Sequence, residues 1–146
     1  MASQILNLNK KTLHARESKM LSVNWAFFCD YAFVTRDGKV SAIGIKDYES
    51  TVPSFPISFP NLYIVMAVRA DDGSAFRRRI KLFDPIGIEV MEFEFGTMNT
   101  DPEIRDHRFI EWLYLARFSQ MGKYRFEILL NDQTATTLPF WITERA

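Results

Sequence analysis

Residues 25 to 45 read WAFFCDYAFV, then TRDGK, then VSAIGI, and they predict two antiparallel β-strands joined by a tight turn. The Asp37-Gly38 pair lies between two apolar runs, and an Asp-Gly pair in that position is the strongest short-range signal for a β-hairpin. Aromatic and β-branched side chains on both sides of the pair suit a pleated strand. The expected strands are therefore Trp25–Val34 and Val40–Ile45.

The pattern typical of β-strands continues along the chain. Pro53, Pro56 and Pro60 cannot donate backbone hydrogen bonds, so residues 51–61 are expected to be an extended connection or an edge segment. A strand is predicted for Leu62–Ala70. Three more are predicted at about residues 107–118, 123–130 and 136–143.

A second hairpin is predicted over residues 76–95. Asp84-Pro85-Ile86-Gly87 has proline in the second position of a four-residue turn and glycine in the fourth, which suits a type I turn. If Asp84 and Gly87 close the turn, the cross-strand pairs are Arg79 with Glu92, Arg77 with Glu94, Ile80 with Met91 and Phe76 with Phe95. Each pair of opposite charges contributes about 0.2–1 kcal/mol. The basic run 77–79 is thus explained without a nucleic-acid ligand.

Gly122 and Tyr124 have the spacing of a tyrosine corner, in which a tyrosine near the start of a strand returns its hydroxyl to the backbone just upstream. Strands and turns also alternate at the interval found in two-sheet proteins, about 8–12 residues. Together these features predict an all-β fold, an immunoglobulin-like antiparallel β-sandwich of about eight strands with Greek-key topology.

The sequence also resembles a family of small bacterial β-sandwich proteins classed only as a domain of unknown function. The resemblance is carried by WAFFCDYA at 25–32, by GKV at 38–40, by IGI at 43–45 and by GKYRFE at 122–127. It covers roughly residues 22 to 143. It implies the fold, and it supplies no activity, cofactor or catalytic residue.

Length and composition limit the function further. The chain has 146 residues, 47% of them hydrophobic and 25% charged, and a net charge of zero. This composition is typical of one folded domain, expected over residues 22–146, and gives no bulk attraction to nucleic acid. No apolar run is long enough for a membrane span. The single cysteine, Cys29, cannot form an intramolecular disulfide, so we expect a cytoplasmic protein.

Residues 1–21 differ from the remainder because they carry four basic residues against one acidic residue, Glu17. Charged chain ends are commonly frayed or weakly helical. We expect a basic arm of that kind, and the alternative is an arm that docks on an acidic surface of a partner.

Candidate catalytic groups are few. A nucleophilic site would have to use His14, in the arm, or His107 with Asp101, Glu103 or Asp106. Cys29 lies among aromatic residues, where burial disfavours the thiolate, so we interpret it as a core side chain. The sequence has no phosphate-binding loop and no metal-binding motif, and we expect neither a cofactor nor a metal.

Asp30 stands within an almost wholly apolar run. A buried carboxylate needs partners, so one interpretation is a backbone or arginine contact that fixes the strand or a bulge. The other interpretation places Asp30 in a ligand pocket with Trp25 and Tyr31.

Three predicted strands, 25–34, 62–70 and 109–118, have apolar residues at both odd and even positions. An open sandwich exposes one face of each sheet to water, so something must cover the second face: the arm, the segment 51–61, or another copy of the chain. The leading hypothesis is a non-enzymatic association module, either a homo-oligomer, in the simplest case a dimer, or a module that binds another protein.

The second hypothesis is a small-ligand or carbohydrate-binding domain. Its stacking platform would come from the following aromatic residues: Trp25, Tyr63, Trp112, Tyr114 or Trp141. A hydrolase centred on His107 is the third hypothesis.

Overall fold

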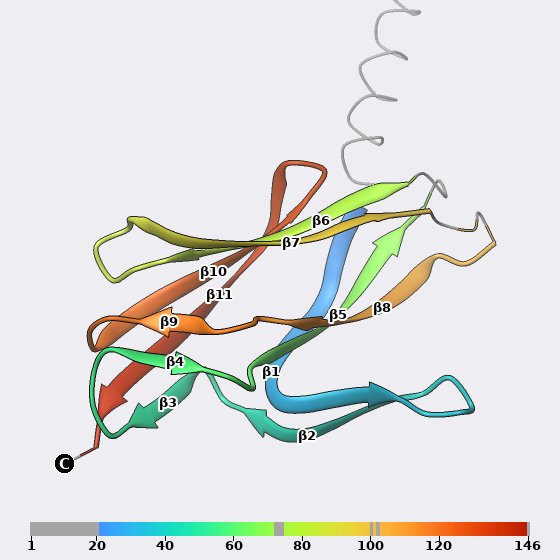
Figure 1. Cartoon of the computed structure of the whole chain (residues 1–146). Helices are drawn as coiled ribbons and strands as arrows, with labels where there is room; N and C mark the ends of the chain where they lie inside the picture. The colour runs from blue at the N-terminus through green and yellow to red at the C-terminus, as the bar shows by residue number, and fades with distance from the viewer. Residues whose placement is uncertain (1–20, 72–74, 100, 102, 146) are drawn as a thin grey trace, which may run out of the picture.

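Two β-sheets packed face to face form the body of the computed structural model, which describes residues 21–71, 75–99, 101 and 103–145 (Figure 1). The strands in chain order are β1 (Leu21–Val34), β2 (Val40–Lys46), β3 (Glu49–Val52), β4 (Ile57–Phe59), β5 (Tyr63–Ala70), β6 (Phe76–Phe83), β7 (Glu89–Met98), β8 (Asp106–Trp112), β9 (Ala116–Phe118), β10 (Gly122–Leu130) and β11 (Gln133–Glu144).

The first sheet, sheet A, has the strand order β2-β1-β5-β8, and the second, sheet B, has the order β3-β11-β10-β6-β7. The short strands β4 and β9 form a separate two-stranded sheet. All neighbours are antiparallel except β3 and β11, which are parallel. The chain is an immunoglobulin-like β-sandwich, which confirms the predicted fold class. Within the described part of the chain, no helix is long and apolar enough to cross a membrane.

The described residues form eleven strands where the sequence predicts about eight. The proline-rich segment supplies two short extra strands, β3 and β4, on either side of Pro53 and Pro56. The predicted strand 107–118 divides into β8 and β9 because Leu115 adopts a positive φ of 53°, which an extended strand cannot accommodate. Leu21 already belongs to β1, and the remainder of the predicted arm lies outside the described residues.

Aromatic rings fill the space between the sheets. Phe28 of β1 meets Phe126 and Phe140 of sheet B, with ring centroids 5.1 and 5.0 Å apart. Phe118 of β9 lies 5.5 Å from Phe140, so the two-stranded sheet closes one end of the same core. All four rings are fully buried. Truncating such a ring to alanine costs about 3–5 kcal/mol, so this cluster dominates the stability of the sandwich.

The tyrosine corner forms at Tyr124, which is buried against Phe118 at a centroid distance of 4.8 Å. Its hydroxyl donates to the carbonyl of Gln120 over 2.8 Å and accepts from the amide of Gln120 over 3.2 Å. Gly122 has φ +139°, and a Cβ there would lie 2.7 Å from Cγ of Pro85. Glycine is required because the β6–β7 turn packs directly on this backbone.

The predicted β6–β7 register is wrong by two residues over Arg79–Leu82 and by three over Phe76–Arg78. Gly87 N donates to Asp84 O as the turn predicts, but Asp84 N also donates to Ile88 O, and Gly87 has φ +91°. The type I turn therefore continues into a glycine bulge that adds a residue to the loop. A register shift between Leu82 and Phe83 adds another. A further shift between Arg78 and Arg79 adds a third. As a result the cross-strand Cα partners are Ile80 with Phe93, Arg79 with Glu94, Leu82 with Met91, and Phe76 with Met98.

Candidate association surface

The β1–β2 turn follows the predicted Asp37-Gly38 signal. Thr35 N donates to Lys39 O over 2.8 Å and Gly38 N donates to Thr35 O over 3.0 Å, with Gly38 at φ +80°. The carboxylate of Asp37 accepts from the hydroxyl of Thr35 and lies 3.3 Å from Lys39 Nζ. The bond from Thr35, together with Lys39, holds the pKa of Asp37 below its ordinary value. The turn is thus closed by its own side chains.

Asp30 pairs with a lysine of this hairpin, and the predicted burial of its side chain is wrong. The carboxylate is about half exposed and forms an ion pair with Lys46 of β2 over 3.0 Å. It also lies over Gly44, which has φ +67° and where an added Cβ would collide with the carboxylate. A lysine, rather than the expected backbone or arginine group, is the partner that fixes the two strands. Asp30 therefore fastens β1 to β2.

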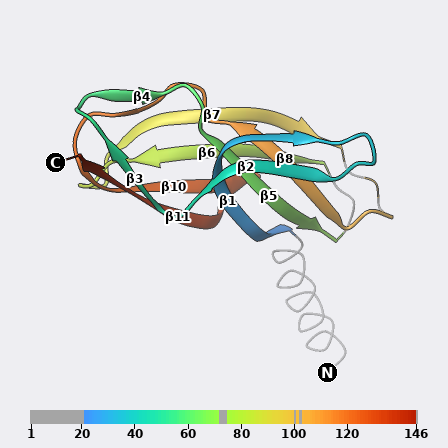
Figure 2. The ribbon, with the colours of Figure 1, turned by 90° about the horizontal axis from the view of Figure 1, so that it is seen from below.

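The segment of residues 30–46, here called the outer hairpin, bends away from the first half of β1 (Figure 1). Seen from below, it runs across β5 and β8 (Figure 2). A second apolar cluster lies at this place, with Cys29, Ala32 and Val65 buried. Around it pack residues of all four strands of sheet A: Phe27, Val40, Ala42, Tyr63 and Ile110. The outer face of sheet A is thus partly covered by its own folded-back hairpin. This cover differs from the three that the sequence predicted, which were the arm, the segment 51–61 and another copy of the chain.

A continuous row of aromatic rings runs along the outer surface of sheet A beside this cluster. The row, here called the aromatic row, has ring centroids 4.7–6.2 Å apart and consists in order of Phe33, Tyr31, Tyr63, Trp112 and Tyr114. Tyr63 and Trp112 are cross-strand partners whose rings stack within 12° of parallel. The indole N–H of Trp112 donates to Pro60 O over 2.9 Å, so its polar atom is already satisfied. The rings hold one another in place.

Much of this surface is exposed to solvent. Tyr114 is 56% exposed, Tyr31 50% and Trp112 45%. The outer hairpin adds three exposed aliphatic side chains, Val34, Ile43 and Ile45, each about three-fifths exposed. A row of exposed rings is a larger apolar feature than the single exposed residues that are ordinary on protein surfaces.

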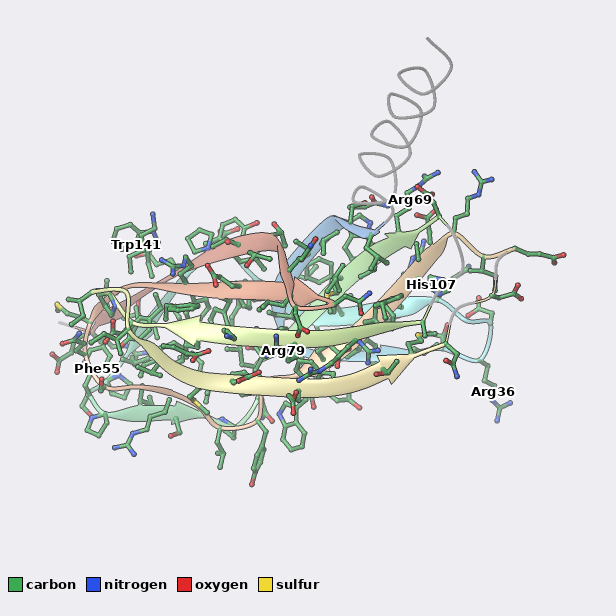
Figure 3. All side chains as sticks on the ribbon, turned by 90° about the horizontal axis from the view of Figure 1, so that it is seen from above. Arg36, Phe55, Arg69, Arg79, His107 and Trp141 are labelled. Carbon is green, nitrogen blue, oxygen red and sulfur yellow. The ribbon has the colours of Figure 1, made fainter. Side chains whose placement is uncertain are left out.

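The other predicted platform residues lie elsewhere. Trp25 stacks on Phe27 at 5.7 Å, on the first half of β1. Trp141 belongs to β11 of sheet B, next to Lys123, and lies toward the opposite end of the molecule from Arg36 (Figure 3). The structure therefore brings together Tyr31, Tyr63, Trp112 and Tyr114, and it separates them from Asp30, Trp25 and Trp141.

The exposed face of sheet B is covered by ion pairs. The contacts are Arg77 with Glu94 and Asp132, Arg79 with Glu92 and Asp132, and Lys81 with Glu89. Both predicted arginine pairs form, but diagonally, because the shifted register moves the glutamates past the arginines. Figure 3 shows Arg79 on the face of sheet B turned toward the viewer.

Arg78 points the other way, into the sandwich. Its Nε donates to Glu111 of β8 over 2.7 Å, and its guanidinium lies 4.2 Å from the centre of the Phe109 ring. Both side chains are almost fully buried. Burial raises the pKa of Glu111 above its ordinary value, and the charge of Arg78 opposes that rise. This ion pair joins the two sheets across the core.

Neither candidate for nucleophilic chemistry in the described residues has suitable surroundings. Cys29 is fully buried and burial raises the pKa of its thiol, so it is a core side chain. His107 is buried beside Phe76 and Phe109, and its Nε2 lies 3.0 Å from the carbonyl of Ile104. Asp101 accepts from the amide of Glu103, and Asp106 accepts from Asn24. The structure therefore does not assemble these groups around His107, and His14 lies outside the described residues.

The sequence of residues 24–143 matches a family described as a family of unknown function, DUF6941. The chain belongs to this family. The match confirms the resemblance to a domain of unknown function and covers every strand of the aromatic row. No curated protein sequence matches the chain.

Two solved structures are similar in fold. One is an alkylpurine DNA glycosylase of Pseudomonas fluorescens, AlkC, bound to DNA that contains an abasic site analogue. It has a TM-score of 0.53 and 6% identity, with 87% of this chain covering 31% of that one, so this chain spans about a third of its length. The other is an immunoglobulin-like protein of Pseudomonas aeruginosa, with a TM-score of 0.40, 10% identity, and coverage of 84% of this chain and 96% of that one. The first likeness shows the fold alone.

Sequence reasoning missed two features of the site. The bend of the outer hairpin was signalled by Gly44, the one glycine inside an apolar strand and opposite the one carboxylate in its partner strand. The inward direction of Arg78 followed from strand alternation between Phe76 and Ile80, but the basic run drew attention to its neighbours instead.

Proposed function

We propose that this protein is a non-enzymatic association module that binds another protein surface, in the simplest case a second copy of itself. The outer hairpin and the aromatic row form its contact surface. The observation that carries the proposal is the continuity of these rings with one another, together with exposed Ile43, which pairs with Tyr31 across the β1–β2 ladder. Tyrosine and tryptophan are the residues that most often dominate binding energy at protein interfaces.

The surroundings of the titratable groups support the non-enzymatic part of the proposal. A catalytic base has to reach its substrate, whereas His107 is packed between phenylalanine rings. The thiol of Cys29 is held in its protonated form by burial. The unpaired thiol also suits a reducing compartment, so the proposal includes a cytoplasmic location.

Sedimentation velocity over a wide concentration range tests the proposal. The wild-type chain should show concentration-dependent association. The double variant Tyr31→Ser/Tyr114→Ser should weaken it by at least about tenfold, which corresponds to about 1.4 kcal/mol. Trp141→Ser is the matched control, because Trp141 is exposed to a similar extent on the other sheet. A chain that stays monomeric at all concentrations, or an equal effect of the control, would contradict the proposal.

A second candidate function, recognition of a flat ligand such as a carbohydrate, is favoured by one observation. The near-parallel rings of Tyr63 and Trp112 form a platform that is ordered before any ligand arrives, since the indole N–H is bound to Pro60. The background Trp25→Phe/Trp141→Phe leaves Trp112 as the only tryptophan. Its fluorescence should then respond saturably to a binding sugar in a glycan panel, and an unchanged spectrum throughout the panel would count against this function.

A further inference from the structure

β2 is the outermost strand of sheet A, and no strand of the described residues pairs with its free side. Its ladder to β1 runs without a break from Val40 to Ile43 and resumes at Ile45. An edge strand of this kind presents unpaired backbone N–H and C=O groups that another extended strand can bind.

The other long edges of the two sheets carry the features that normally prevent such pairing. β7 and β8 have charged residues along their length: Glu89, Glu92, Glu94, Asp106, Arg108 and Glu111. β3 is only four residues long and is followed by Pro53. β2 has neither charge nor proline from Val40 to Ile45, and its one irregularity, Gly44, leaves the regular stretch before it intact. Among these edges β2 is the least protected.

The side chains of β2 are as unpartnered as its backbone. Ile43 and Ile45 are 59% and 64% exposed, which is unusual for isoleucines in a strand. They neighbour Tyr31 and Cys29 across the β1–β2 ladder, so the edge adjoins the aromatic row. A strand that paired with β2 would cover apolar surface as well as backbone.

The charges at the two ends of β2 have opposite sign. The turn before it carries Arg36 and Lys39 against Asp37, all exposed. At the other end Lys46 is paired with Asp30, and the chain just after it carries the exposed Asp47 and Glu49. When a strand pairs antiparallel with a copy of itself, each end meets the opposite end of the partner. The basic turn of each copy therefore faces the acidic end of the other copy, so the dimer contains two such contacts.

From this complementarity, and resting on the association function proposed above, we propose that two copies of this chain pair antiparallel along β2 about a two-fold axis. The two four-stranded sheets then become one continuous sheet, with the β1 end of each aromatic row, Phe33 and Tyr31, one strand away from the joint. An isologous contact of this kind closes on itself and limits the assembly to a dimer.

Charge exchange between the ends of β2 tests this geometry in the full-length chain. The variants are Arg36→Glu/Lys39→Glu at the turn and Asp47→Lys/Glu49→Lys at the other end, with Lys123→Glu on sheet B as the control. Each double variant alone should dimerise at least about tenfold more weakly than wild type, because like charges then face one another. An equimolar mixture of the two should recover dimers as heterodimers, and the control should behave as wild type. Circular dichroism checks that each variant is folded.

The outcomes separate this inference from the function on which it rests. Loss in each variant and recovery in the mixture support β2 pairing. A dimer that is weakened by Tyr31→Ser/Tyr114→Ser but indifferent to the charge variants overturns β2 pairing and leaves the association surface in place. A monomer at every concentration overturns both the β2 pairing and self-association. A mixture no stronger than its components also overturns the pairing.

Discussion

The outer faces of the two sheets differ in the side chains that they carry and in how those side chains are covered. Sheet B carries alternating charges, and its exposed arginines and lysine are matched by carboxylates of neighbouring strands and of the β10–β11 turn. Sheet A carries aromatic and aliphatic side chains, part of which its own hairpin covers and part of which remain exposed. The charges of the first face are matched within one molecule, although Trp141 of β11 is also exposed there. The second leaves aromatic and aliphatic side chains exposed, and this contrast is the basis of the proposed association surface.

The largest effect is expected between the faces, at the buried pair Arg78 and Glu111. Arg78→Met should lower the free energy of unfolding by about 3–5 kcal/mol, because it leaves a buried carboxylate without its partner. Arg78→Met/Glu111→Leu should return close to the wild-type value, since an apolar pair of similar volume removes both charges. Urea unfolding measures both. Arg77→Met on the exposed face is the control. If Arg78→Met lowers the free energy of unfolding no more than this control does, the assignment of Arg78 to the core and Arg77 to the surface has no energetic consequence and the prediction is wrong.

The same pair predicts a pH dependence. The pKa of Glu111 is raised in the folded state, so the folded chain holds the proton to a higher pH than the unfolded chain does. Its contribution to stability is therefore largest below the unfolded pKa, about 4.3, and is lost as the pH rises through the folded pKa. Subtracting the stability curve of Arg78→Met/Glu111→Leu from that of the wild type isolates this term. A difference that grows with rising pH would contradict the assignment.

A smaller effect is expected on the outer face of sheet A. Val65 is fully buried there, beneath the folded-back hairpin, so Val65→Ala should cost about 2 kcal/mol in thermal or urea unfolding. Glu127→Ala, at a half-buried position on the exposed face of sheet B, is the comparison and should cost well below that. Equal costs would mean that the hairpin does not shield this face.

Gly44→Ala should cost about 1–2 kcal/mol, because the residue has a positive φ and its Cβ would meet the carboxylate of Asp30. Adding Asp30→Ala should remove the collision but not the backbone strain, and so recover part of the loss. Full recovery in the double variant would show that the backbone at Gly44 is unstrained.

The smallest effect is expected on sheet B. Arg79→Gln should cost about 1 kcal/mol or less, and the cost should shrink in high salt, since the carboxylates of Glu92 and Asp132 are partly exposed and screened. Association should be unaffected. A change in the association constant would break the contrast between the two faces.

Much of the fold was predictable because the relevant signals are local. Asp37-Gly38, the type I turn at Asp84 and the tyrosine corner at Tyr124 each act within a few residues of the chain. The glycine bulge at Gly87 was harder to predict from the sequence, because one extra loop residue changes the pairing of the whole β6–β7 ladder without changing the strand pattern.

The candidate site was predictable only in part. An excess of apolar residues on both strand faces indicated uncovered surface, and three of the five platform residues do meet, with Tyr31 beside them. Which surface closes on itself depends on the bend at Asp30 and Gly44, a contact between two strands that neither strand reveals alone. The burial of Arg78 likewise depends on a carboxylate from the other sheet.

Hydrogen exchange of the wild-type chain at low and high concentration tests the contrast between the two faces most directly. The account predicts concentration-dependent protection in segments 31–46 and 112–115, and unchanged exchange in segment 77–94 of sheet B. Protection confined to sheet B, or exchange that is the same at both concentrations over the whole of sheet A, would contradict it.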